Sequence, residues 1–92
     1  MISLQDKSPT VTVLTTYRNS NGLINRAIRS ALASTLQSRE IIVVNDGSDY
    51  PDYLRKEYLN DSRLRYIEIE HRGRAEALNL ALSRARGEFV AI

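Results

Sequence analysis

Residues Glu40 to Asp49 read Glu-Ile-Ile-Val-Val-Asn-Asp-Gly-Ser-Asp. The run from Ile41 to Val44 is β-branched throughout, which is typical of a strand buried on both faces of a parallel sheet. It stops at Asn45–Ser48, residue types that favour turns and helix caps. Ligands of open α/β sheets bind outside the carboxyl ends of the strands. Asp46 is therefore expected at the mouth of a ligand crevice; the alternative is that it only makes a turn or caps the next helix, and this stretch alone favours neither.

Composition restricts the chain to one small domain. Its 92 residues are 42% hydrophobic and 26% charged, as in soluble globular proteins. The absence of Cys excludes a disulfide framework and a thiolate metal site, and it fits the cytosol. A net charge of +2 is too small to indicate a nucleic-acid partner. No apolar run approaches the length of a membrane span. We expect residues 1–9 to be a loose lead-in and residues 10–92 to form the domain.

Hydrophobic periodicity predicts strands that alternate with helices. The expected strands are 11–16, about 40–44, 64–70 and 88–92, and the expected helices are 23–32, from 49–52 to 59, and about 74–85. We expect Ser20 or Asn21 to cap the first helix, which fades through residues 34–38. Pro51 is expected in the first turn of the second helix, and Gly87 is placed to end the third.

The order βαβαβαβ implies right-handed crossovers and a three-layer α/β/α fold with a mainly parallel sheet. The third strand is expected nearer the sheet edge because it is more polar, and the fourth strand beside the first. The chain ends within its last predicted strand, 88–92, which indicates a piece of a longer protein.

Several common site types have no counterpart in the sequence. Neither Gly-x-Gly-x-x-Gly nor a P-loop motif occurs, which makes a dinucleotide-binding or P-loop enzyme a poor fit. There is no His-Cys cluster with metal spacing and no Gly-x-Ser-x-Gly elbow. A receiver-like signalling domain would need acidic residues after the first strand, where Thr15-Thr16-Tyr17 stands instead.

Three loops are expected to meet at the carboxyl edge of the sheet: residues 16–19, 45–49 and 71–74. Together they have the chemistry to bind a nucleotide. A carboxylate accepts a base N–H, and hydroxyl or backbone groups meet a ribose. A guanidinium beside a helix N-terminus suits a diphosphate, because charge and helix dipole act in the same sense. The alternative is that the arginines are only solvated and that His71 is a plain loop residue, which we favour for His71.

The chain resembles the N-terminal part of a family 2 glycosyltransferase with the GT-A fold, a Rossmann-like fold. The matching pieces are Val11–Thr16 with Asn19, Ala27–Leu32, Glu40–Ser48, Gly73 with Ala77-Leu-Asn79, and Ala85–Ile92. Their order and spacing together are specific. The resemblance implies transfer of a sugar from a UDP- or GDP-sugar to an acceptor hydroxyl, and it makes residues 10–92 a truncated nucleotide-sugar-binding domain.

The same resemblance implies roles for particular residues. Asp46 matches the aspartate that contacts the base, and Thr16 with Tyr17 and Arg18 lies on the loop that contacts base and ribose. Arg74 matches a basic position that reaches the diphosphate. The family often has Pro in place of Thr16 and Tyr in place of Arg18, so that Tyr17 is a candidate for the missing ring. Asn45 replaces a frequent first aspartate, which leaves Asp46 as the better candidate.

The family's Asp-x-Asp motif, which binds Mn²⁺ or Mg²⁺, would follow directly after Ile92. We therefore assign no catalytic residue and no metal ligand within this chain, and expect it not to turn over alone. The competing hypothesis is a non-catalytic α/β module that binds a nucleotide or a partner protein.

We expect a cytoplasmic location, with the inner face of a membrane as one site for the full-length protein. The exposed edge of the last strand invites homo-oligomer formation.

Overall fold

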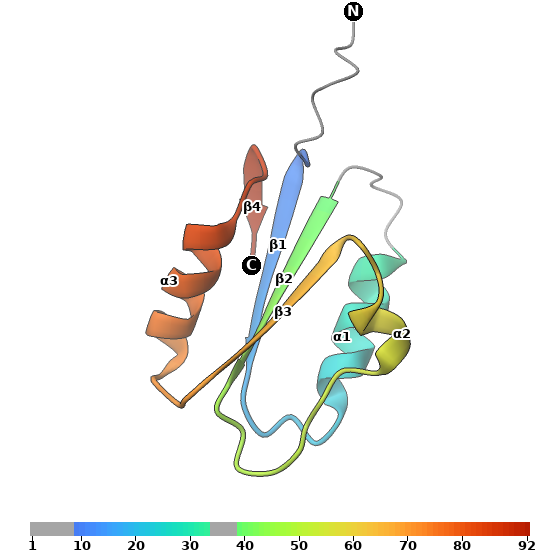
Figure 1. The fold of residues 1–92 in the computed structure, drawn as a ribbon. Helices are drawn as coiled ribbons and strands as arrows, with labels where there is room; N and C mark the ends of the chain where they lie inside the picture. Colours follow the sequence, from blue (N-terminus) through green and yellow to red (C-terminus); the bar gives the residue numbers. More distant parts are fainter. Residues whose placement is uncertain (1–8, 34–38) are drawn as a thin grey trace, which may run out of the picture.

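A parallel four-stranded sheet forms the centre of the molecule. The computed structural model describes residues 9–33 and 39–92. The strands are β1 (Val11–Tyr17), β2 (Arg39–Asp46), β3 (Leu64–Ile69) and β4 (Phe89–Ala91). They are all parallel and lie in the order β3-β2-β1-β4 (Figure 1). The predicted positions of β3 at an edge and of β4 beside β1 are confirmed.

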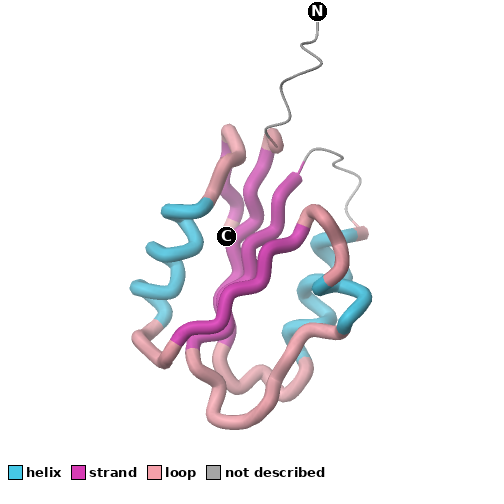
Figure 2. The backbone as a smooth tube through the Cα atoms, in the orientation of Figure 1, coloured by secondary structure: helices cyan, strands magenta, loops and turns pink. Residues whose placement is uncertain are grey.

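Helices cover both faces of this sheet. They are α1 (Leu23–Leu32), α2 (Lys56–Leu59) and α3 (Arg74–Arg84). α1 and α2 lie on one face and α3 lies on the other (Figures 1 and 2). The three-layer α/β/α fold with a βαβαβαβ order is confirmed, and it is the architecture expected of the N-terminal part of a GT-A domain. None of the helices in residues 9–33 and 39–92 has the length and apolar character of a membrane span.

Strand β2 is buried along its whole length, as its uninterrupted β-branched run predicts. Side chains alternate between the two faces of a strand. Ile41 and Val43 pack in the cluster that contains α1, while Ile42 and Val44 pack in the cluster that contains α3. Full burial of each such side chain contributes about 1.5–3 kcal/mol, and these four residues are fully inaccessible to solvent. β2 thus holds its polar tip on a rigid support.

The prediction that a second helix starts at residues 49–52 is wrong, because α2 begins only at Lys56. The side chain and the backbone of Asp52 are both engaged elsewhere. Its carboxylate accepts hydrogen bonds from the amides of residues 20–22, and its carbonyl oxygen accepts one from the Tyr17 hydroxyl. These contacts with the β1–α1 loop hold Asp52 outside a helix, so Pro51 does not occupy a first helical turn.

The start of α1 also differs in detail from the prediction. The N-cap position is Gly22, whose φ of 84° is left-handed and favours glycine. Ser20 still accepts a hydrogen bond from the amide of Ile24 at 3.2 Å through its hydroxyl. The predicted fading of the first helix over residues 34–38 falls outside the described residues, as do residues 1–8 of the predicted lead-in.

At the opposite end of the sheet, Glu40 on β2 joins β1 to the segment that leads into β4. Its buried carboxylate accepts hydrogen bonds from the Thr12 hydroxyl at 2.8 Å and the Arg86 amide at 2.9 Å. Gly87 does not end α3, which stops at Arg84. A Cβ at Gly87 would instead lie 2.5 Å from the Thr12 amide nitrogen, so glycine permits this close approach to β1.

Candidate functional site

The carboxyl ends of β1, β2 and β3 reach the same edge of the sheet, next to the N-terminus of α3 (Figures 1 and 2). A pocket of about 270 Å³ lies on the α3 side of this edge. Six residues line it: Thr16, Tyr17, Arg18, Asp46, His71 and Arg74. The structure therefore brings all five residues predicted for the site to one pocket and adds His71.

Asp46 connects the tip of β2 to the loop before α3. Its side chain is 4% exposed. One carboxylate oxygen accepts the Arg72 amide at 2.8 Å, and the other accepts the Gly73 amide at 3.1 Å and lies 3.2 Å from His71 Nδ1. Burial opposes ionisation, but these hydrogen bonds and the neighbouring imidazole outweigh it, so the pKa of Asp46 lies below its usual range. Asp46 accordingly fixes another loop instead of shaping its own turn.

The turn after β2 is made by Asn45. Its side-chain oxygen accepts hydrogen bonds from the Ser48 amide at 3.2 Å and the Ser48 hydroxyl at 2.7 Å, and its Nδ2 donates to the Tyr66 hydroxyl at 3.1 Å. Asn45 thus shapes the turn, while Asp46 lines the pocket. Because successive strand residues face opposite sides, Asn45 and Asp46 serve opposite faces of the sheet.

Gly47 allows the second and third loops to meet. Its φ is +62°, and a Cβ there would lie 2.3 Å from the backbone nitrogen of His71. No real Cβ makes such a contact, so any side chain at this position displaces the residues that Asp46 holds. Gly47 is therefore part of the site's construction, although it carries no functional group.

Tyr17 faces the core. It is 9% exposed and belongs to the cluster beneath α1. Its hydroxyl donates to the Asp52 carbonyl oxygen at 2.5 Å and lies 3.1 Å from the Tyr66 hydroxyl. Burial and the neighbouring Tyr66 raise the pKa of Tyr17. Its ring is thus committed to packing, and we interpret Tyr17 as a support of the pocket wall.

Sequence reasoning missed two further residues of this region. Asp52, 4% exposed, accepts the amides of Ser20 at 2.5 Å, Asn21 at 3.1 Å and Gly22 at 3.0 Å. Burial raises the pKa of Asp52, but these hydrogen bonds lower it by more, so its pKa lies below the usual range. The backbone amides of residues 20–22 come just before α1, where helix N-terminal amides lack partners within the helix. That was the signal in the sequence for an acceptor at this place. His71, taken as a plain loop residue, contacts Asp46 and lines the pocket.

The remaining pocket residues supply polar and positive groups. Arg18 is exposed and pairs with Asp49 at 2.9 Å. Arg74 is exposed and is the first residue of α3, where the free amides and the helix dipole also favour an anion. Within the described part of the chain, no three His, Cys, Asp or Glu residues gather as metal ligands would. The pocket as built suits a negatively charged ligand.

Comparisons with known proteins are consistent with one another. The profile described as "Glycosyl transferase family 2" matches residues 12–92. The chain is similar to the "Putative glycosyltransferase EpsH" of Bacillus subtilis, with 34% identity over 92% of this chain and 25% of that protein. It is also similar to the "Succinoglycan biosynthesis protein ExoO" of Rhizobium meliloti, with 36% identity over 95% of this chain and 25% of that protein. It is similar, too, to the "Glycosyltransferase GlyA" of Streptococcus pneumoniae, with 34% identity over 87% of this chain and 12% of that protein. The chain thus spans about a quarter or less of these relatives.

Proposed function

The chain belongs to glycosyl transferase family 2, and from this premise we propose that the pocket beside Asp46 binds the nucleotide part of a UDP- or GDP-sugar. The full-length protein would transfer the sugar to an acceptor hydroxyl. The observation that supports this most directly is the lining of the pocket, where the ends of β1 and β2 meet the first residue of α3. The name of one relative, a succinoglycan biosynthesis protein, favours polysaccharide assembly as the setting.

Each group in the pocket has a role in this proposal. Arg74 and the α3 N-terminus bind the diphosphate, because a guanidinium and free backbone amides both favour phosphate oxygens. Asp46 accepts the amides of Arg72 and Gly73 and lies beside His71 Nδ1. A carboxylate has about four acceptor positions, so at least one remains for a base N–H. Thr16 supplies a hydroxyl for the ribose. Arg18 adds positive charge, and Tyr17 acts from beneath by positioning the loop.

Transfer itself needs groups beyond those described. Family membership generally implies a divalent cation, which stabilises the negative charge on the leaving diphosphate. The described residues do not fit such an ion, because Asp46 already binds a loop and no third ligand lies near it and His71. We propose that Mn²⁺ or Mg²⁺ is held by an Asp-x-Asp segment after Ile92, and that residues 1–92 alone bind the donor without turnover.

Two further parts of the proposal concern the surroundings of the protein. We place the full-length protein in the cytoplasm, at the inner face of a membrane if its acceptor is membrane-bound. The side chains of β4 are exposed, and in the described chain only β1 pairs with it. A second copy pairing with that open edge would give a homo-oligomer, which light scattering would detect.

Isothermal titration calorimetry of the chain with UDP and with GDP tests the donor-site proposal. We expect saturable binding of one of the two nucleotides and no binding of a nucleoside that lacks phosphate. Absence of binding by both nucleotides would refute the donor site. An assay of sugar transfer from UDP- and GDP-sugars tests the second part, since turnover by residues 1–92 would refute the need for a later segment.

A further inference from the structure

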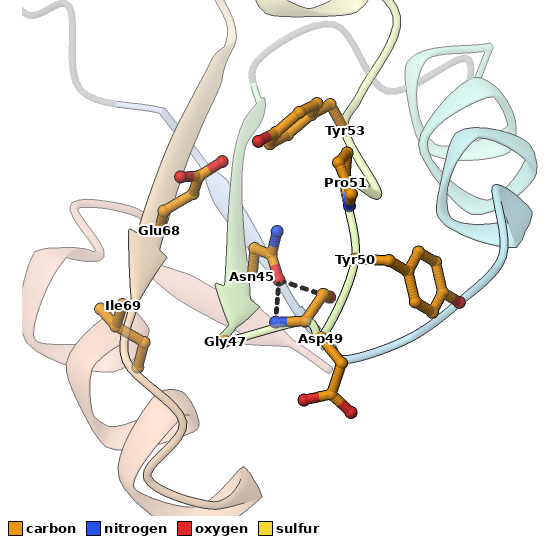
Figure 3. Close-up of a pocket in the computed structure, with 9 residues that line it drawn as sticks. Asn45, Gly47, Asp49, Tyr50, Pro51, Tyr53, Glu68 and Ile69 are labelled. Atoms are coloured by element: carbon orange, nitrogen blue, oxygen red, sulfur yellow. Dashed lines mark hydrogen bonds between the residues drawn. The ribbon is translucent and has the colours of Figure 1, made fainter.

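A second cavity, of about 350 Å³, lies at the same end of the sheet but on the opposite face (Figure 3). The loop after β2 forms one wall, with Tyr50 and Tyr53, and the end of β3 forms the other, with Glu68. Asn45 belongs to this cavity and Asp46 to the nucleotide pocket. Because these adjacent strand residues face opposite sides, the two hollows are separate sites with the tip of β2 between them.

The charge of the second cavity is opposite to that of the first. Two of its lining residues are carboxylates, Asp49 and Glu68, and none is Lys, Arg or His. Asp49 forms an exposed ion pair with Arg18 at 2.9 Å. Glu68 accepts the Tyr66 hydroxyl at 2.9 Å and has no cationic partner within the described residues. An anionic ligand such as a diphosphate is therefore disfavoured here, and a ligand rich in hydroxyl donors is favoured.

The two tyrosines differ in what they offer to a ligand. The Tyr50 ring turns away toward the β1–α1 loop, where its hydroxyl accepts the Asn21 amide at 2.9 Å (Figure 3). Tyr53 is 58% exposed, and its hydroxyl end points across the hollow toward the carboxylate of Glu68 (Figure 3). Tyr53 thus presents a rigid ring with an apolar face and a polar end, opposite the carboxylate of Glu68 (Figure 3).

We propose that this cavity is a carbohydrate-binding subsite for an uncharged saccharide. Sugar hydroxyls donate charge-assisted hydrogen bonds to Glu68, and the C–H face of a sugar ring packs on Tyr53. A saccharide brings several hydroxyl donors and an apolar face together, which matches the acceptors and the ring across this hollow. The subsite stands apart from the nucleotide pocket and does not depend on nucleotide binding there.

Nuclear magnetic resonance titration of the ¹⁵N-labelled chain tests the subsite. The probes are maltotriose, cellotriose and, as a cation without hydroxyls, tetramethylammonium chloride. We expect at least one trisaccharide to shift the amide signals of residues 47–53 and 68–69, with a Kd in the millimolar range. Tyr53→Ala is expected to abolish these shifts. Glu68→Gln keeps an acceptor for Tyr66 but loses the charge, and is expected to weaken binding about tenfold.

The control variant is Glu57→Gln, which removes an exposed carboxylate from α2 outside the cavity and should leave saccharide binding unchanged. Three results would overturn the proposal: no shifts with either trisaccharide, shifts that survive Tyr53→Ala, or shifts caused by tetramethylammonium alone. Binding of UDP and of GDP is measured in parallel. Its presence or absence reports on the nucleotide pocket only, so the two proposals fail separately.

Discussion

The carboxylate of Asp46 accepts the amide of Arg72 at 2.8 Å, which couples the tip of β2 to the loop that leads into α3. Arg74, which we propose binds the diphosphate, begins α3 two residues after Arg72. A single buried carboxylate therefore places the positive residue of the pocket relative to the strand ends. The same carboxylate keeps an acceptor position free, so its role in positioning the loop is compatible with the base contact that we propose for Asp46.

Asp46→Asn should loosen this loop. The Asn side chain has only one acceptor oxygen, so one of the amides of Arg72 and Gly73 would face an NH₂ group. We expect a loss of about 2 kcal/mol in the free energy of unfolding and faster hydrogen exchange at both amides. Urea unfolding and exchange measured by magnetic resonance check this. Asp49→Asn, at an exposed ion pair, is the control and should cost less than about 1 kcal/mol. Equal losses in the two variants would contradict the assigned role of Asp46.

Gly47→Ala and Gly22→Ala form a matched pair. Both glycines have positive φ, 62° and 84°, but a Cβ at Gly47 would collide with the His71 backbone, whereas a Cβ at Gly22 would meet nothing within 4 Å. Gly22→Ala carries only conformational strain, about 1 kcal/mol. Gly47→Ala adds displacement of the third loop, and we expect a loss of at least about 2 kcal/mol together with weaker binding of whichever nucleotide, UDP or GDP, the unaltered chain binds. If both variants unfold at the same urea concentration, the close contact of the two loops is not as described.

Asp52→Asn should release the β1–α1 loop. Its carboxylate serves three amides, and an Asn side chain cannot satisfy all three without turning its NH₂ group toward one of them. We expect a loss of about 2 kcal/mol and faster hydrogen exchange at residues 20–22, with exchange at residues 72 and 73 unchanged. If exchange changed equally in both loops, Asp52 would act on the whole fold instead of on the loop it binds.

The stability of the chain should fall in acid, because carboxyl groups whose pKa values are lowered by folding become protonated there. Hydrogen bonds from the Arg63 side chain and amide lower the pKa of Asp61 to about 2, and the pKa values of Asp46 and Asp52 are also lowered. A carboxyl group with a lowered folded-state pKa stabilises the fold above its unfolded pKa, about 3.9, and this stability is lost as pH falls through the folded pKa.

We therefore expect the free energy of unfolding to fall between about pH 4 and about pH 2. Asp61→Asn should make that fall shallower, because one of the titrating groups is gone. Urea unfolding at several pH values in this range measures both curves. Parallel curves for the two proteins would show that the Asp61–Arg63 contact does not form in solution.

The part of the fold that local patterns determine was predictable. The β-branched run of β2, the periodicity of α1 and α3, and the polar character of β3 depend on neighbouring residues, and they predicted a buried central strand and an edge strand correctly. The position of Asp46 at the strand tip followed from the same reasoning. These features needed no knowledge of distant contacts.

Two of the missed features depend on residues far apart in the sequence, and a third depends on where β1 ends. The start of α2 depends on Asp52 binding amides about 30 residues earlier. The inward orientation of Tyr17 follows because β1 runs one residue beyond the predicted Thr16, so that the strand's alternation places Tyr17 in the core. Gly87 lies against Thr12, 75 residues away, which local sequence does not reveal.

Calorimetric titration of UDP and GDP into three proteins tests the central claim most directly: the unaltered chain, Arg74→Ala, and Arg26→Ala as a control at an exposed position of α1. We predict that one nucleotide binds the unaltered chain and Arg26→Ala equally, and that Arg74→Ala weakens its affinity about tenfold or more through loss of a charged phosphate contact. Equal affinity of all three proteins, or no binding to any, would contradict a donor site between Asp46 and Arg74.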